Sequence, residues 1–205
     1  MSRHCVSTPP LPDKKYSIIY ADPPWSHTVV IRRNDPKRAS AASFFYQTLS
    51  KTDLCKIPIQ RIAEADSLLF MWVSSPLLDE AIEVGTAWGF RYITVGFVWD
   101  KRLPVVGYYT MSQCELCLVF KKGKIPQPRG KRNIRQFLSM KRGRHSEKPV
   151  KVRQRITEMF PTQSKIEIFA RQRFEGWDAW GNEIDDAPPQ AIEIQDEPRQ
   201  QEFVF

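Results

Sequence analysis

Five short runs of mostly apolar residues lie along the chain and indicate its architecture. They occupy residues 16–20, 67–73, 91–99, 114–120 and 165–170. Runs of this length, separated by Gly-, Pro- or charge-rich stretches, are typical of β-strands. The run at 67–73 is apolar without alternation, which predicts a strand buried on both faces. We expect the run at 165–170 to be the final strand.

Two segments between these runs have the spacing of amphipathic helices. Ser75 is expected to be the N-cap, and Pro76 the first residue, of a helix that ends at Gly89. Its predicted apolar face consists of Leu77, Leu78, Ala81 and Ile82. The second predicted helix runs from Pro149 to Phe160, with Val152, Ile156 and Met159 on one face.

Strands that alternate with helices predict an α/β sheet that contains parallel strands. In such sheets, ligands bind beyond the carboxyl ends of the strands. Asp22 and Arg171 each follow a predicted strand, so we expect both on the same edge of the sheet. Residues 26–50 and 121–147 lack periodicity and are predicted to be long loops, which in compact domains usually carry function.

Length and composition favour one globular domain of 205 residues with 41% hydrophobic and 26% charged residues. No apolar run reaches the length of a membrane span. The first 15 residues lack the apolar core of a signal peptide, and four cysteines without such a signal suggest reduced thiols. We therefore expect a cytoplasmic protein with a flexible segment at 1–15, a folded domain at 16–184 and an acidic, disordered tail at 185–205.

Charge is distributed unevenly along the chain, whose net charge is +8. Residues 121–155 contain fourteen Lys and Arg and one acidic residue, whereas residues 175–205 contain nine acidic residues and one Arg. A stretch as basic as 121–155 is typical of proteins that contact phosphates, although a solvated loop is the alternative.

The most informative chemical motif is Asp22-Pro23-Pro24-Trp25, directly after the first predicted strand. A 6-amino group of adenine is a poor nucleophile, because its lone pair is delocalised into the ring. The Asp22 carboxylate and the Pro23 carbonyl can accept its two hydrogens, since neither proline has an N–H to compete. The face of Trp25 can stack on an extruded base. A strand-ending turn with a core tryptophan is the alternative interpretation.

Over residues 16–184 the sequence resembles the MT-A70 family of S-adenosylmethionine-dependent adenine methyltransferases. The chain is as compact as the prokaryotic or phage members of this family. Besides the motif at 22–25, the resemblance rests on YQTL at 46–49, LLFMWV at 68–73, AWGF at 87–90, HSEKP at 145–149, IEIFAR at 166–171, GWD at 176–178 and WGNE at 180–183. It implies a Rossmann-like class I methyltransferase fold with permuted motif order, a mixed, mostly parallel sheet and helices on both faces.

The resemblance also implies that S-adenosylmethionine is the methyl donor. The residues expected to bind this cofactor are Asp22, Ser146, Lys148, Arg171, Arg173, Asn182 and Glu183. A cation at 148 or 171 can pair with the cofactor carboxylate, and the amide and carboxylate at 182–183 can bind its ribose hydroxyls. The sequence has no glycine-rich turn after the last predicted strand, so this assignment rests on the family motifs.

The implied substrate is adenine in nucleic acid, with DNA favoured over RNA. An adenine inside a duplex cannot reach Asp22, so the substrate is a single strand or a flipped nucleotide. Phosphate contacts are expected from Arg32, Arg33, Lys37, Arg38, Lys131, Arg132, Arg135, Lys141, Arg142 and Arg144. A short chain without a target-recognition domain implies a short or loose sequence preference, or one supplied by a partner subunit or a second copy. A catalytically silent, nucleic-acid-binding scaffold for an active partner is the alternative function.

Several other residues leave their roles open. Cys114 and Cys117 have the spacing of half a zinc site, but no second pair follows, so we predict no metal. His145 is a general base, a structural residue or a residue that faces the substrate, and Glu115 supports either the fold or the site. The neighbouring tyrosines at 108 and 109 either stack on a base or pack against the protein.

Overall fold

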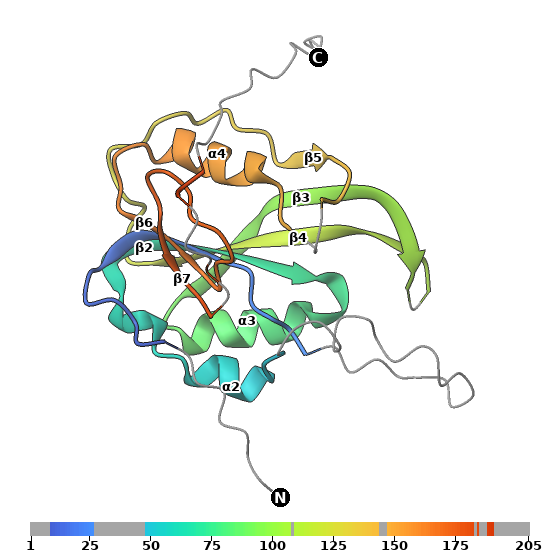
Figure 1. Ribbon diagram of the computed structural model, residues 1–205, viewed down its shortest axis with the longest axis horizontal. Coiled ribbons are helices and arrows are strands. Elements are labelled where there is room, and N and C mark those ends of the chain that lie inside the picture. Colours follow the sequence, from blue (N-terminus) through green and yellow to red (C-terminus); the bar gives the residue numbers. More distant parts are fainter. Residues whose placement is uncertain are drawn as a thin grey trace, which may run out of the picture.

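The computed structural model describes residues 9–26, 48–107, 109–143, 147–182, 184 and 188–190, which fold around a seven-stranded sheet (Figure 1). Its strands are β1 (Tyr16–Ala21), β2 (Ala63–Ser74), β3 (Arg91–Val106), β4 (Met111–Lys122), β5 (Phe137–Ser139), β6 (Lys165–Ile168) and β7 (Asp178–Trp180). Their order across the sheet is β5-β3-β4-β2-β1-β6-β7.

Six of these seven strands point the same way. The pairs β1–β2, β1–β6, β6–β7 and β3–β5 are parallel, whereas β4 is antiparallel to both of its neighbours, β2 and β3. We call the edge where the six parallel strands end the carboxyl edge. The mixed, mostly parallel sheet is consistent with the Rossmann-like methyltransferase fold expected from the sequence.

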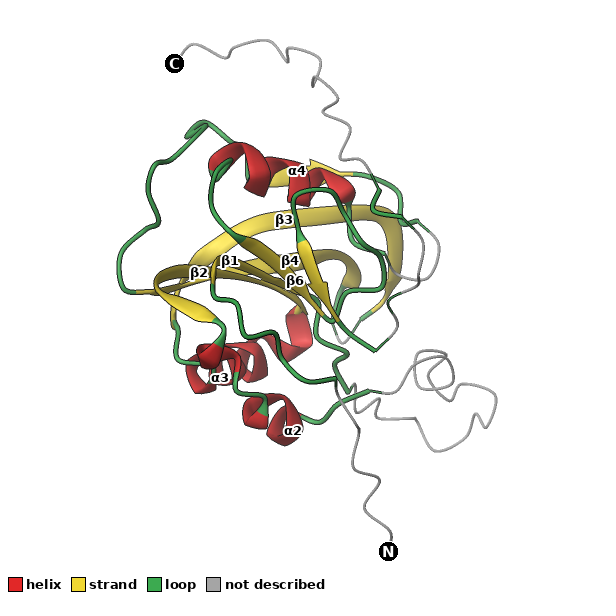
Figure 2. Cartoon of the chain, turned by 60° about the vertical axis from the view of Figure 1, so that its left-hand side comes forward, coloured by secondary structure: helices red, strands yellow, loops and turns green. Residues whose placement is uncertain are grey.

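Helices cover both faces of the sheet (Figure 2). On one face, α2 (Lys51–Lys56) and α3 (Leu78–Ala87) pack in a core that contains Ile19, Leu69 and Met71. On the other face, α4 (Val150–Met159) packs in a core that contains Tyr20 and Trp72. Over residues 18–21 of β1 and 68–73 of β2, successive side chains alternate between the two cores, which explains why these stretches carry no charged residue.

The five predicted strands and both predicted helices are present, and the expected apolar face of α3 packs in the core. The expected N-cap at Ser75 is wrong. Residues Ser75–Leu77 form a 3-10 turn with proline at its start, so α3 begins only at Leu78 and has no side-chain cap. Gly89 follows the helix with a φ of 85°, a conformation that favours glycine.

Two strands, one α-helix and the 3-10 helix Ile59–Arg61 were not predicted. Strand β5 lies inside the segment 121–147 that we expected to be a loop, and β7 follows the strand that we expected to be the last. Both have only three residues, too few to display a period, and their pairing depends on neighbours that are distant in sequence. Helix α2 is similarly short; Ser50 caps it by accepting the backbone N–H of Asp53.

Described parts of the two terminal segments contact the domain. The indole N–H of Trp180 lies 3.1 Å from the carbonyl oxygens of both Pro9 and Pro10, and Lys14 pairs with Asp178 at 2.8 Å. Gln190 forms a parallel bridge with Phe174. The predicted boundaries at 16 and 184 stay predictions. In the described part of the chain, every helix is too short or too polar to cross a membrane.

A buried ion pair joins α4 to β6. Arg153 donates to both carboxylate oxygens of Glu167, with an Nε–Oε2 distance of 2.6 Å, and each side chain is only 6% exposed. The guanidinium carbon also lies 4.2 Å from the ring centre of Phe174 and 5.2 Å from that of Tyr20. Because a buried charge that loses its partner is strongly destabilising, the docking of α4 depends on Glu167.

Replacing Glu167 by Ala should therefore lower the free energy of unfolding by about 3–5 kcal/mol, because Arg153 would remain charged and unpaired in the core. Urea titrations followed by tryptophan fluorescence measure the loss. The control is the double variant Arg153→Met/Glu167→Leu, which leaves no unpaired charge and should recover most of the stability. A Glu167→Ala protein as stable as the wild type would show that this pair does not hold α4 in place.

Candidate active site at the carboxyl edge

The residues after β1 form a tight turn on the carboxyl edge. The Pro23 carbonyl accepts the Trp25 N–H at 2.8 Å, and the Pro24 carbonyl accepts the Leu49 N–H at the same distance. The Ser26 N–H donates in return to the Leu49 carbonyl at 3.2 Å. Because two consecutive prolines cannot continue the ladder, the strand ends here and the chain is pinned to the segment before α2.

The side chain of Trp25 anchors this turn to the neighbouring strand. The residue is 8% exposed, and its indole N–H donates to the Trp72 carbonyl at 2.9 Å. Neither proline competes for the Pro23 carbonyl, as expected, but the backbone N–H of Trp25 donates to it at 2.8 Å. A carbonyl oxygen has two lone pairs, so one acceptor site remains. Stacking of Trp25 on a base stays a prediction.

An ion network surrounds the Asp22 carboxylate. The Lys148 ammonium lies 2.9 Å from Asp22 Oδ1 and 3.2 Å from Glu115 Oε2, and Lys101 lies 3.1 Å from Glu115 Oε1. The Lys148 nitrogen is also 5.9 Å from the ring centre of Trp72. The side chain of Lys148 is 10% exposed, whereas that of Asp22 is 25% exposed. The network therefore fixes one oxygen of Asp22 from the protein side.

The carboxylates keep Lys148 charged despite its burial. Burial alone would lower the pKa of Lys148, but Asp22 and Glu115 outweigh this effect and raise the pKa above its usual value. Burial likewise acts to raise the pKa of Glu115, but Lys148 and Lys101 overcome it and lower the pKa. Burial, followed by the charge of Asp22, raises the pKa of Cys117 well above its usual value, so this thiol stays protonated.

The ends of β6 and β7 come together beside this network. Phe169 follows β6 with a φ of 61°, unusual for a residue with a side chain, and its ring lies against Trp88 and Trp180. A Cβ at Gly181 would lie 2.4 Å from the Ala170 carbonyl oxygen. This close approach needs glycine, and it brings the residues after β7 against the residues after β6.

The structure therefore brings several predicted cofactor residues to one edge. Asp22, Arg171 and Asn182 follow β1, β6 and β7, three adjacent strands, so the predicted shared edge of Asp22 and Arg171 is confirmed. Lys148 reaches the same edge from the start of α4. The predicted residues Ser146 and Glu183 lie outside the described residues.

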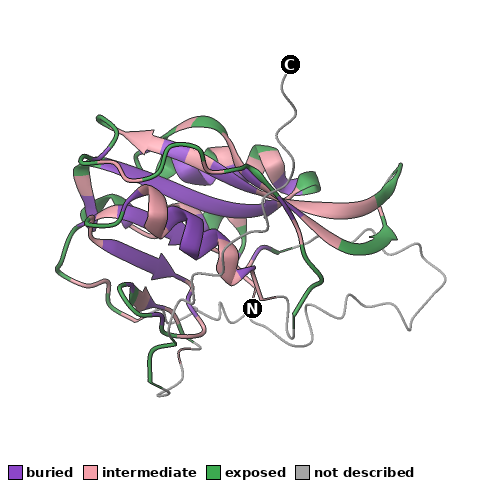
Figure 3. Cartoon of the chain, turned by 90° about the horizontal axis from the view of Figure 1, so that it is seen from above, coloured by how far each residue is buried: buried purple, intermediate pink, exposed green. Residues whose placement is uncertain are grey.

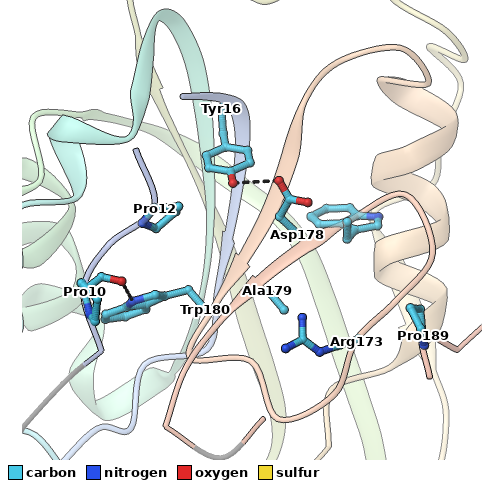
Figure 4. Close-up of a pocket in the computed structure, with 9 residues that line it drawn as sticks. Pro10, Pro12, Tyr16, Arg173, Asp178, Ala179, Trp180 and Pro189 are labelled. Atoms are coloured by element: carbon cyan, nitrogen blue, oxygen red, sulfur yellow. Dashed lines mark hydrogen bonds between the residues drawn. The ribbon is translucent and has the colours of Figure 1, made fainter. Parts of the chain in front are cut away.

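Arg173 lies beside β7. It lines a hollow of about 510 Å³ together with Tyr16, Trp177, Asp178 and Trp180 (Figure 4). The Tyr16 hydroxyl donates to Asp178 at 2.7 Å on the wall of this hollow. The expected contact of Arg173 with the cofactor stays a prediction.

The predicted phosphate-binding residues are divided between two edges of the sheet. Lys141 and Arg142 are exposed and follow β5, which runs parallel to β3, so they lie on the carboxyl edge. Lys131 lies at the opposite edge, because its N–H donates to the Glu158 carbonyl at 2.8 Å and its ammonium pairs with that carboxylate at 3.0 Å. Glu158 is in the last turn of α4, and the other end of α4 is at the carboxyl edge.

Arg132 directly follows Lys131 and therefore lies at the same edge, whereas Arg135 lies in the segment that leads to β5; both are exposed. The residues outside the described part of the chain are Arg32, Arg33, Lys37, Arg38 and Arg144. His145 and Tyr108 also lie there. Tyr109 is fully exposed, so it does not pack against the protein.

Sequence analysis missed two residues at this edge. Lys101 completes the ion network but comes from the long β3, in a stretch with no motif. Ser74 ends β2, and its hydroxyl oxygen is buried without a hydrogen-bond partner among the described residues. In that same part of the chain, His, Cys, Asp and Glu form no cluster of three or more that could hold a metal ion.

The sequence of the chain matches a family model and several known proteins. The MT-A70 family model matches residues 16–183. The type II methyltransferase M.MunI of a Mycoplasma species is 50% identical over 91% of this chain and 84% of its own length. The mouse N(6)-adenine-specific methyltransferase METTL4 is 27% identical and the zebrafish N(6)-adenosine-methyltransferase subunit METTL3 is 26% identical, each over 83% of this chain. The chain spans only 38% and 28% of these two proteins.

The ion network predicts a specific pH dependence of stability. The pKa of Glu115 is lowered on folding, so its contribution is complete above the ordinary value of 4.5 and is lost as pH falls through the lower, folded value. The variant Glu115→Gln lacks this contribution. Its unfolding free energy should therefore decrease less than that of the wild type from pH 5 to pH 3, as measured by urea titration. The exposed Glu83→Gln is the control, and identical wild-type and Glu115→Gln slopes would contradict the assignment.

Proposed function

The chain belongs to the MT-A70 family, and on that premise we propose that it transfers a methyl group from S-adenosylmethionine to the 6-amino group of adenine in DNA. The observation that carries the proposal is the Asp22 carboxylate, held by Lys148 after β1 within the matched region. DNA is preferred because the relative at 50% identity is a bacterial type II methyltransferase, whereas RNA is named in a fungal relative at 25% identity.

Asp22 and Pro23 supply the two acceptors that the adenine amine needs. Lys148 binds Oδ1 of Asp22, which leaves Oδ2 as an acceptor for one N–H of the amine. The remaining lone pair of the Pro23 carbonyl accepts the other. Both acceptors sit in a turn held by backbone hydrogen bonds to Trp25 and Leu49, so the amine is oriented before reaction. Two such acceptors draw the nitrogen lone pair out of conjugation with the ring.

The charges around Asp22 suit the charge that develops on the amine. When the nitrogen forms its bond to the methyl group it becomes positive, and the negative charge of Asp22 stabilises it. The excess proton passes from the nitrogen to Asp22 and then to water. Lys148 does not transfer a proton in this scheme, because its raised pKa keeps it an ammonium. It acts by holding Asp22 and Glu115 in place.

The residues of the carboxyl edge fit S-adenosylmethionine. When bound, this cofactor supplies an electrophilic methyl group on a sulfonium, whose sulfur leaves with the bonding electrons. Since Lys148 already serves two carboxylates, we assign the cofactor carboxylate to Arg171 and the ribose hydroxyls to Asn182 and Glu183. The unpartnered buried hydroxyl of Ser74 offers a further polar contact on the same edge. Ser146 and Arg173 complete the proposed set.

The proposal requires adenine to leave its base stack, because Asp22 lies in a turn that is only partly exposed. Lys141 and Arg142 lie on the same edge and are the proposed phosphate contacts. A silent scaffold is the weaker alternative, since a scaffold has no use for a carboxylate held by a buried lysine. The cytoplasmic location, the sequence preference and the number of subunits remain predictions.

Replacing Asp22 by Asn should reduce methylation by about a hundredfold or more, because the amide lacks the negative charge that stabilises the developing cation. Wild type and variant are incubated with S-adenosylmethionine and unmethylated duplex DNA, single-stranded DNA or RNA, and digested nucleosides are assayed for 6-methyladenine by mass spectrometry. DNA binding should change little, and the variant should stay folded because Lys148 keeps its ion pair with Glu115.

Asp66→Asn is the control, because Asp66 is exposed near the start of β2, at the opposite edge and outside the hollow that Arg173 lines. Full activity of Asp22→Asn would refute the proposed site. Product on RNA alone would refute the choice of DNA. A wild type that forms no product and gains no thermal stability from S-adenosylmethionine would favour the scaffold.

The division of basic residues predicts unequal effects on DNA binding. Replacing Lys141 and Arg142 together by Gln should weaken binding and reduce the slope of log K against log salt by about 1.8, the value for two lost phosphate contacts. Lys131→Gln/Arg132→Gln removes the same charge at the opposite edge and should leave the slope unchanged. Fluorescence anisotropy with a labelled duplex measures both slopes. Equal losses in the two variants would place the DNA across both edges.

A further inference from the structure

The ribbon formed by β3 and β4 projects far beyond the rest of the sheet (Figure 1). Strand β2 ends at Ser74, which pairs with Glu115, and from there outward β4 pairs only with β3. The ribbon continues to the pair Val106–Met111. Within the described part of the chain, the outer part of the ribbon, residues 101–114, pairs with no further strand, because β5 pairs only with residues 98–100 of β3.

The outer part of this ribbon is exposed or half-buried (Figure 3), and its exposed side chains include several large apolar ones. Residues 103–112 include no Lys, Arg, Asp or Glu, although the whole chain has 26% charged residues. Val106 is 81% exposed and Met111 is 57% exposed, and Tyr109 at the turn is fully exposed. Exposed apolar groups that cluster in this way mark a contact surface.

The ribbon extends over the side of the molecule on which Asp22 lies. Ala21 pairs with Met71 of β2, and Met71 pairs with Leu118 of β4. Asp22 is one residue beyond Ala21, so it lies close to the row of Cys117, which is one residue beyond Leu118 in the same direction. The ribbon continues for six residues from Cys117 to Met111, about 20 Å at 3.3 Å per residue. Its tip therefore stands beyond the proposed methylation site on the carboxyl edge.

Positive charge lies at the base of the ribbon rather than at its tip. Strand β5 pairs with residues 98–100 of β3, and the exposed Lys141 and Arg142 follow it. The Met140 N–H donates to the Asp100 carbonyl at 3.0 Å, which fixes the start of this basic pair against the ribbon. A polyanion held at the base would have the apolar tip directed into it.

Given the proposed function, we propose that the tip of this ribbon, with Val106, Tyr109 and Met111, inserts into the DNA duplex at the place of the extruded adenine. Removing an adenine from a duplex leaves a gap in the base stack, and this gap costs a few kcal/mol. Apolar side chains inserted between base steps fill such gaps, and a two-stranded β-ribbon fits a DNA groove. The basic pair at the ribbon base binds phosphates while the uncharged tip enters the stack.

The test compares duplex with single-stranded DNA, because only a duplex needs a replacement for the extruded base. The variant Val106→Ser/Tyr109→Ser/Met111→Ser keeps the ribbon but removes its apolar tip. Unmethylated plasmid DNA, intact or heat-denatured, is methylated with labelled S-adenosylmethionine, and initial rates are compared. The variant should lose about tenfold or more on intact DNA and about twofold or less on denatured DNA. Ile93→Ser, on the same strand and 42% exposed, is the control and should match the wild type on both.

Permanganate oxidation of unpaired thymines gives a second measurement that does not depend on the single-strand rate. Thymines opposite the methylated adenines should become reactive when wild-type protein binds the intact plasmid, and should stay unreactive with the triple variant. Equal loss of rate on both DNA forms, or unchanged thymine reactivity, would overturn the proposal. A wild type that sediments as a dimer, with a monomeric triple variant, would instead assign the tip to contact with a second copy. A wild type inactive on both DNA forms would overturn the proposed function itself.

Discussion

The candidate site depends on the ion pairs of Lys148 with Asp22 and Glu115. Each carboxylate comes from a different part of the sheet, and without the ammonium their charges would repel each other in a partly buried space. Burial acts to lower the pKa of Lys148, and the two carboxylates reverse this effect. Each of the three charges is therefore stabilised by the others. The start of α4, the end of β1 and the middle of β4 are joined by charge as well as by packing.

The sheet explains how residues so distant in sequence meet. Parallel strands all end at one edge, so the turns after β1, β6 and β7 lie next to one another. The pair Arg153–Glu167 holds α4 against β6, which also fixes the start of the helix where Lys148 lies. In place of the glycine-rich turn common after such a strand, Phe169 adopts a left-handed φ that its contacts with Trp88 and Trp180 support. Aromatic packing thus supports a left-handed backbone conformation that glycine adopts without strain.

Sequence reasoning located the features encoded within a few neighbouring residues. The buried strands, the two longer helices and the Asp22 turn each have a local pattern, and the order of motifs indicated the fold. Pairings across the sheet have no such pattern, so the Glu115–Lys148 contact, the three-residue strands and the role of Lys101 were not predicted. The charge along the sequence predicts one basic surface for the segment 121–155. The fold instead places Lys131 beside Glu158 in the last turn of α4 and Lys141 after β5 on the carboxyl edge.

Strand β4 links the catalytic and the projecting parts of the molecule. Among the strands of the described chain, it alone runs antiparallel to its neighbours. A parallel strand must leave the sheet at the carboxyl edge, but an antiparallel pair can continue past it with its backbone hydrogen bonds satisfied. This geometry lets β3 and β4 form a ribbon that neither β1 nor β6 could form. Glu115 lies where β4 passes from that ribbon into the sheet, and it is bonded to both Lys101 and Lys148. A single carboxylate therefore joins the base of the ribbon to the lysine that holds Asp22.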